Sequence, residues 1–355
     1  MKRFNYESES LKLVRDYYGM SQTAFAKEIN LTQSKLSKIE NGELELPEES
    51  VSNIEGFTKR FFEMSYSPTA QKLYYRKLAS TSKSMVSKFE ARLNLISNIL
   101  KYLLEHVSIP ENKLPSIDAE DFNLDFEYIA EEVRIALDIP RGPINDIVAS
   151  LEKAGVIIHF FDYDFITEGN RKFDGVSTYV DGVPVILINN KIPNSRKVFT
   201  IAHELGHLVM HFDYIIHPDR DIECEANKFA SAFLAPKAEV KKEFKSFNLD
   251  RLFYLKTEWK MSAAAILYRA KEIGNINDDW YRRCMVWLSN YRKREPYEFD
   301  IKTPSMLKRI IEVLKEKLDF SLLHTLGLKE SVQSELLSTI YPKKERKLKI
   351  SISNI

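Results

Sequence analysis

The sequence is poor in cysteine and has no long apolar run. Its 355 residues include only Cys224 and Cys284, which are too few for a disulfide framework. No stretch of 18 uncharged apolar residues is present, and the chain does not start with an apolar segment, so neither membrane insertion nor secretion is expected. We therefore expect a protein without membrane association, in a reducing cytoplasm.

An excess of charge of one sign is also missing. The chain has 52 Lys and Arg against 51 Asp and Glu, a net charge of +1, which gives the whole chain no bias toward polyanions. The apolar share of 44% is enough for ordinary hydrophobic cores, and the length suggests two or three domains. Histidine is scarce as well, with seven residues in the chain.

Three of these histidines lie in the apolar segment 200–211, and the first two form the pattern His-Glu-Leu-Gly-His. Because residues four apart share a helix face, His203 and His207 can direct both imidazoles at one metal ion. Glu204 lies beside that face and is placed to take a proton from an attacking water. A chance match is the rival explanation, and the scarcity of histidine makes it weak.

A second segment, 222–236, offers a third ligand, since a catalytic zinc site has three protein ligands and one open position. Glu223 is the expected ligand, and Asn227 follows it by one helical turn, so that its amide can support the carboxylate or an imidazole. Glu225 points to the other side of this helix and is expected to be a solvated charge. His211 is the alternative third ligand, although a capping or packing role fits its place one turn after His207 better.

The N-terminal part of the chain carries an independent pattern. Residues 21–42 predict two short helices around a tight turn, with Ser21 and Thr32 as N-caps and Gly42 as the stop signal. Apolar positions would lock the two helices together, and they are Ala26, Ile29, Leu31, Leu36 and Ile39. The outer side of the second helix is then polar, which suits the major groove of DNA.

This stretch resembles the helix-turn-helix of the Xre/Cro phage-repressor family almost position by position. The resemblance implies base contacts by Gln33, Ser34 and Lys38, and phosphate contacts by Gln22, Lys35 and Asn41. Residues 1–70 hold nine Lys and Arg against eleven Asp and Glu, a net of −2, so a strong nonspecific grip on DNA is not expected. The alternative is a domain that binds a protein or serves for dimerisation.

Between these two patterns the sequence predicts strands. Residues 156–161 are a short apolar run, and Asp181-Gly182 separates two further apolar segments, a strong signal for a β-hairpin. An exposed strand before the histidine-bearing helix could hold an extended peptide by main-chain hydrogen bonds. A plain structural hairpin explains the pattern equally well.

Segments around the two histidines carry a second resemblance. They look like the ImmA/IrrE family of zinc metallopeptidases over about residues 120 to 275, and the matching pieces are Phe173-Asp174-Gly175, Ile186 to Asn189, Arg196 with Phe199 to His207, and Glu223 to Asn227 through Pro236. The resemblance implies a gluzincin-like site with Zn2+ held by His203, His207 and Glu223, and with Glu204 as the base. It also implies a protein substrate, a helix-turn-helix repressor.

The expected fold is α+β and mostly helical, in four parts. They are a five-helix helix-turn-helix domain at 1–66, a linker with one long amphipathic helix at 67–115, a minimal metallopeptidase domain with a small sheet at 116–240, and a helical region at 241–355. The long helix is expected to connect and space the two functional units.

The expected function is that of a DNA-binding regulator with a zinc-dependent endopeptidase domain. It would bind a DNA operator and cleave a repressor or antitoxin-like protein to control stress or mobile-element genes, and it could form a homodimer. The alternative is a non-proteolytic helix-turn-helix regulator or antitoxin with a vestigial peptidase fold. A third reading combines both activities, because DNA docking would bring the peptidase to a repressor on the same operator.

Overall fold

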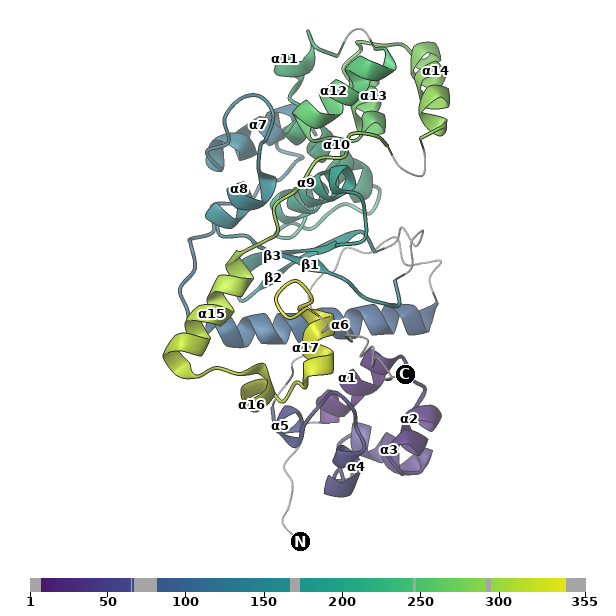
Figure 1. Ribbon diagram of the computed structural model, residues 1–355, viewed down its shortest axis with the longest axis vertical. Coiled ribbons are helices and arrows are strands. Elements are labelled where there is room, and N and C mark those ends of the chain that lie inside the picture. Colours follow the sequence, from purple (N-terminus) through teal and green to yellow (C-terminus); the bar gives the residue numbers. More distant parts are fainter. Residues whose placement is uncertain are drawn as a thin grey trace, which may run out of the picture.

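The fold is described by a computed structural model over residues 8–64, 66, 82–166, 173–244, 247–291 and 295–342. Residues 67–81 of the expected linker lie outside this described part. Helices dominate the described residues and surround one small sheet at mid-height of the molecule (Figure 1). This arrangement confirms the expected α+β, mostly helical class.

The N-terminal domain contains the five expected helices. Their bounds are Ser8–Tyr18 for α1, Gln22–Glu28 for α2, Gln33–Glu40 for α3, Glu48–Ser52 for α4 and Lys59–Phe62 for α5. The side chains of Ser21 and Thr32 cap α2 and α3 by accepting hydrogen bonds from the backbone amides of Ala24 and Lys35. Leu36 is fully buried, which locks α3 onto the other helices.

The sheet has three strands, β1 (Ile157–Phe161), β2 (Gly175–Val180) and β3 (Val183–Asn189). β3 lies in the middle, parallel to β1 and antiparallel to β2. The hairpin turn has positive φ at Asp181 (47°) and Gly182 (80°), as a type I′ turn requires. The Asp-Gly signal in the sequence therefore located a real hairpin.

Both faces of this sheet are covered. The covering helices are α9 (Asn194–Met210) on one face, backed by α10 (Ile222–Leu234), and α6 (Lys83–Leu104) on the other. Along β3, Ile186 and Ile188 join the core under α9 and α10, whereas Val185 and Leu187 join the core beneath α6. Burial on two sides explains why β3 is an almost uninterrupted apolar run.

The long helix α6 is packed on both sides rather than spanning solvent. The ring of Phe89 lies 5.8 Å from that of Phe161 in β1. Arg92, which is 6% exposed, donates to the backbone oxygen of Tyr17 in α1 at 2.9 Å and pairs with Glu335 at 2.6 Å. The helix expected to space two units instead forms part of a core that they share.

The C-terminal region also contacts the N-terminal domain. Its last helices are α15 (Met306–Leu318), α16 (Leu322–Leu326) and α17 (Glu330–Leu336). The backbone amide of Thr58 donates to the oxygen of Gly327 at 2.9 Å, and that of Lys329 donates to the oxygen of Gly56 at 2.8 Å. These bonds flank a short antiparallel bridge, so the helix-turn-helix domain is held by backbone contacts as well as by α6.

The remaining helices enclose the upper half of the molecule in Figure 1. Their bounds are Phe126–Ala136 for α7, Ile147–Lys153 for α8, Lys237–Val240 for α11, Leu249–Trp259 for α12, Ala263–Glu272 for α13 and Asp278–Ser289 for α14. Within the described residues, none of the helices has the length and apolar character that crossing a bilayer demands.

Candidate metal centre

Helix α9 carries the His-Glu-x-x-His pattern and lies close against α10. Its first turn is anchored by Glu298, whose carboxylate accepts a hydrogen bond from the backbone amide of Ser195 at 2.6 Å. A Cβ atom added at Gly206 would lie 2.8 Å from the ring of Phe229 in α10. Glycine at this position therefore allows the close approach that brings the two helices, and their polar side chains, together.

Three side chains from α9 and α10 converge on one point. The Nε2 atoms of His203 and His207 are 3.1 Å apart. One carboxylate oxygen of Glu223 lies 3.7 Å from the first of these atoms, and the other oxygen lies 3.5 Å from the second. A tetrahedral zinc ion with its usual bond lengths places its donors about 3.3 to 3.5 Å apart. The three residues thus form a group that can hold a metal ion.

The hydrogen bonds behind the two imidazoles agree with this geometry. The Nδ1 atom of His203 lies 3.0 Å from the side-chain oxygen of Asn227, which can only accept. A neutral His203 therefore carries its proton on Nδ1 and presents a lone pair at Nε2. The Nδ1 atom of His207 has its own partner, His211, at 2.9 Å. With a metal ion bound, both Nε2 atoms would present lone pairs to it beside the carboxylate of Glu223.

Glu204 lies next to this group and is held by a strand residue. Its side chain is buried, and the hydroxyl of Ser177 in β2 donates to its Oε2 atom at 2.7 Å. Because one oxygen is engaged in this way, the orientation of the carboxylate is defined. Ser177 was absent from the expected site, since it precedes Glu204 by 27 residues and no local pattern links the two.

The sequence predicted that Glu225 is a solvated charge, and this prediction is wrong. It does lie on a different side of α10 from Glu223, but that side is covered, and Glu225 is 6% exposed. It accepts hydrogen bonds from His211 at 3.1 Å and from Arg220 at 2.6 Å. Burial by itself raises the pKa of the Glu225 carboxyl, but these two partners outweigh it and lower the pKa to about 2.

His211, the alternative third ligand, is placed behind His207. It is the C-cap residue of α9 and is completely buried. One ring nitrogen contacts His207 and the other contacts Glu225, so the metal group contains Glu223 and not His211. Burial lowers the pKa of His211, which favours the neutral ring.

The residues expected to contact DNA gather on and around α3. Five of them are exposed, namely Gln33, Ser34, Lys35, Lys38 and Asn41. Gln22 is half-buried, donates to Glu40 at 2.7 Å and accepts from Gln33 at 3.0 Å. Glu40 also pairs with Arg15 at 2.6 Å. This ion pair, which sequence reasoning missed, fixes Gln22 and through it the first residue of α3.

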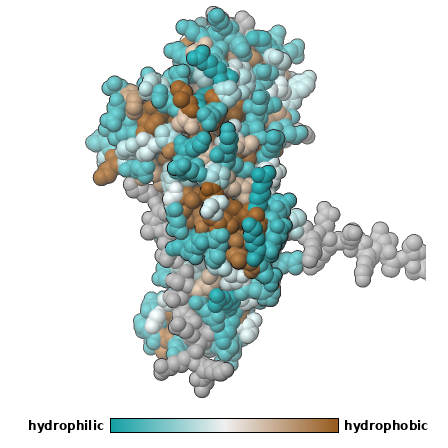
Figure 2. All heavy atoms as spheres, turned by 90° about the vertical axis from the view of Figure 1, so that its left-hand side faces the viewer, coloured by the Kyte–Doolittle hydropathy of each residue, from teal (hydrophilic) through white to brown (hydrophobic). Residues whose placement is uncertain are grey.

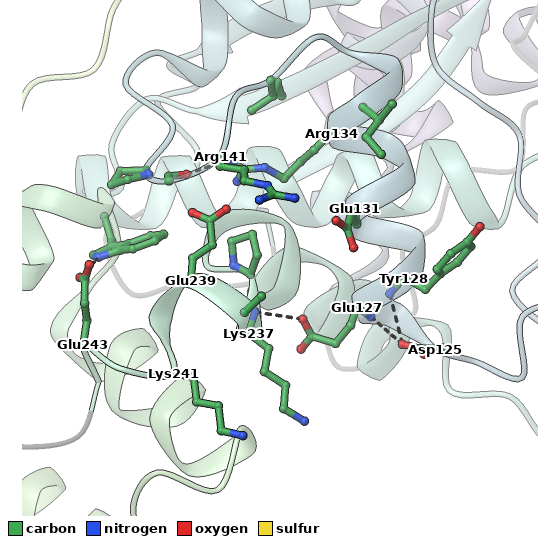
Figure 3. A pocket seen from close by; sticks show the side chains of 17 residues that line it. Asp125, Glu127, Tyr128, Glu131, Arg134, Arg141, Lys237, Glu239, Lys241 and Glu243 are labelled. Carbon is green, nitrogen blue, oxygen red and sulfur yellow. Dashed lines mark hydrogen bonds between the residues drawn. The ribbon is translucent and has the colours of Figure 1, made fainter.

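Two cavities lie away from the metal group. One of them, beside α7 and α11, has a volume of about 1040 Å³, and its lining side chains are drawn in Figure 3. There the Arg134 guanidinium donates to the backbone oxygens of Phe233 and Gly142, each at 2.7 Å. The other cavity has a volume of about 470 Å³ and is lined by Ile109, Met306 and Ile310 among others. Apolar side chains also gather at mid-height on the side of the molecule that carries α15 (Figure 2). None of the three candidate ligands lines either cavity.

Comparison with protein families matches two parts of the chain. Residues 152–271 match the IrrE N-terminal-like domain of the peptidase M78 family, and residues 11–59 match a helix-turn-helix family. The first range contains the sheet, α9 and α10, and the second contains α2, α3 and α4. The comparison with curated proteins gives no match.

Proposed function

We propose that this chain, which carries a helix-turn-helix domain joined to an IrrE N-terminal-like peptidase domain, is a DNA-binding regulator with a zinc-dependent endopeptidase activity. Its substrate would be a helix-turn-helix repressor or an antitoxin-like protein, whose cleavage releases stress or mobile-element genes. The convergence of His203, His207 and Glu223 is the observation that carries the proposal.

Zinc is the metal that this donor set fits. Two imidazole nitrogens and one carboxylate oxygen, with a fourth position left open, form a common catalytic zinc set. A bound zinc ion would supply a Lewis acid that polarises a peptide carbonyl and lowers the pKa of water. Purification of the full chain, zinc counting, and incubation with repressors encoded near its gene test the proposal directly. Stoichiometric zinc and specific cleavage are the expected results.

In this proposal Glu204 is the proton carrier. Its carboxylate takes a proton from the attacking water and delivers it to the nitrogen of the leaving amine. Ser177 holds Oε2 by a hydrogen bond of 2.7 Å, so the carboxylate does not have to reorganise between the two transfers. The alternation of β2 places Ser177 on the face toward α9, whereas Val176 and Val180 point into the core beneath α6.

The position of β2 supports peptide binding beside this group. In the strand order β1-β3-β2, β2 is at the edge of the described sheet, and Ser177 links it to Glu204. An extended segment of the substrate would pair with this edge by main-chain hydrogen bonds and so present its carbonyl to the metal. Such pairing recognises the main chain of the substrate and not its side chains, which suits cleavage within an unfolded or exposed segment.

Ser177→Ala is expected to lower the cleavage rate about 10- to 100-fold, because it removes one hydrogen bond to a charged group, a contribution of about 1.5 to 3 kcal/mol. Zinc content should not change, since Ser177 contacts the base and not a ligand. Initial rates of repressor cleavage measure the effect. Thr178→Val is the matched control, because the neighbouring side chain points to the opposite face and should leave the rate near wild type.

The DNA-binding half of the proposal depends on the exposed face of α3. Gln33 and Lys38 are both exposed there, and glutamine can pair with adenine through two hydrogen bonds. The domain is bound to the rest of the molecule through Gly56 and Thr58, so a peptidase docked at an operator would keep a defined position relative to the DNA. This would raise its local concentration near a repressor on the same site.

The double variant Gln33→Ala, Lys38→Ala should lose sequence-selective DNA binding by about 5- to 150-fold for each base contact removed, given about 1 to 3 kcal/mol for a good base contact. Gel shifts with the operator upstream of its own gene, in competition with unrelated DNA, measure this ratio. Lys59→Ala removes an exposed lysine from α5 of the same domain and serves as the control. Equal selectivity of the double variant and wild type would exclude α3 as the reading helix.

A further inference from the structure

A continuous row of buried side chains leads away from the candidate metal group. It starts at His207, whose Nδ1 lies 2.9 Å from Nδ1 of His211. The Nε2 atom of His211 lies 3.1 Å from Oε2 of Glu225. Arg220 then donates to both oxygens of Glu225, at 2.9 and 2.6 Å. The side chains of these four residues are between 0 and 9% exposed.

Only one arrangement of protons satisfies this row when His207 binds a metal. The Nε2 atom of His207 then presents a lone pair, so its Nδ1 carries the proton and donates to His211. His211 must accept at Nδ1 and therefore carries its own proton on Nε2, which donates to Glu225. The carboxylate accepts this bond together with two from Arg220. Every donor in the row thus meets an acceptor.

We propose that His211, Glu225 and Arg220 are positioning residues that hold the His207 imidazole in its metal-binding orientation and strengthen its bond to zinc. This inference rests on the proposed function of the same site. Hydrogen bonds from a ligand imidazole to a carboxylate fix the ring and raise its basicity. Here the carboxylate of Glu225 does not contact His207 directly, and the imidazole of His211 between them transmits its effect.

The two ligand histidines are supported by separate routes. His203 donates to Asn227 of α10, and His207 donates to His211 at the end of its own helix. The second route reaches the surface, because Arg220 also lies 3.2 Å from Glu120 in the segment before α7. If the buried ion pair of Arg220 and Glu225 served packing alone, it would not need a link through His211 to the imidazole of His207. The separation of the two routes gives the proposal a specific test.

The test compares zinc affinities of the full chain by competition with a chromogenic chelator. His211→Phe keeps a ring but removes both hydrogen bonds, and Glu225→Gln keeps the shape but removes the charge. Both should bind zinc about 10- to 100-fold more weakly than wild type. His217→Ala removes an exposed histidine from the segment between α9 and α10, which also contains Arg220, and should bind zinc like wild type. If His211→Phe does not fold, Glu225→Gln decides the question.

Combining variants separates positioning from general destabilisation. His211→Phe with Glu225→Gln should lose no more affinity than His211→Phe alone, because both interrupt one route. His211→Phe with Asn227→Ala should lose the product of the two single effects, because they act on different rings. Tight zinc binding by wild type with equal affinity in His211→Phe and Glu225→Gln would overturn this inference and leave the proposed function standing. Absence of zinc binding by wild type would overturn both.

Discussion

Glu204→Gln is expected to retain stoichiometric zinc while repressor cleavage falls by about 10²- to 10⁴-fold, the usual contribution of a general acid-base group. The amide has the size of the carboxylate and can still accept the hydrogen bond from Ser177 through its oxygen. It cannot accept the proton of the attacking water, because an amide is not basic at neutral pH. Glu204 is absent from the group of three convergent donors, so metal binding should be preserved.

Two measurements on the same preparation check this result, the zinc content of the dialysed protein and the initial rate of cleavage. Glu312→Gln, a substitution of an exposed glutamate on α15, is the matched control and should cleave at the wild-type rate. Cleavage by Glu204→Gln at that rate, with zinc still stoichiometric, would show that another group is the base. A zinc-loaded wild-type chain that cleaves no repressor would favour the non-proteolytic regulator instead.

His203→Ala is expected to lose zinc, with affinity falling by more than the about 10- to 100-fold that loss of a ligand's hydrogen-bond partner costs, since one of three protein ligands is removed. The remaining donors, His207 and Glu223, cannot close a tetrahedral site by themselves. Selective DNA binding should survive, because α3 contributes no residue to the group of three convergent donors. The measurement is metal content after dialysis, together with gel shifts on the operator.

His106→Ala provides the control for this variant. His106 is exposed just after α6 and contacts the backbone oxygen of Tyr102, so its removal should leave both zinc content and DNA binding unchanged. Stoichiometric zinc in His203→Ala at wild-type affinity would contradict the ligand set. Loss of DNA binding together with zinc would show that the metal also stabilises the helix-turn-helix domain through the core shared with α6.

Local signals predicted much of this architecture. Ser21 and Thr32 marked the starts of two helices because a side-chain oxygen before a helix accepts an otherwise unpaired amide. Asp181-Gly182 marked a hairpin because both residues tolerate positive φ. The His-Glu-x-x-His spacing and the helical position of Glu223 likewise predicted three donors that converge in the structure. The caps, the hairpin turn and the two histidines each depend on residues a few positions apart, whereas Glu223 comes from a separate helix.

Periodicity failed where burial depended on distant segments. It placed Glu225 on another side of the helix from Glu223, and the usual exposure of glutamate assigned that side to solvent, although Arg220 and His211 contact Glu225 there. It also assigned α6 to a spacer role, because an amphipathic helix shows one apolar stripe but does not reveal how many partners share it. Phe89 and Arg92 in fact face the sheet, the N-terminal domain and α17.

Sequence alone predicted the donors of the candidate metal group, their helical spacing and the caps of α2 and α3, because these features are written in short stretches of residues. Tertiary structure decided what surrounds that chemistry. Ser177 reaches Glu204 from a strand, and Glu225 reaches His207 through His211 across two helices. These contacts depend on how a twisted sheet and its covering helices pack, and packing joins residues whose separation along the chain carries no periodic signal.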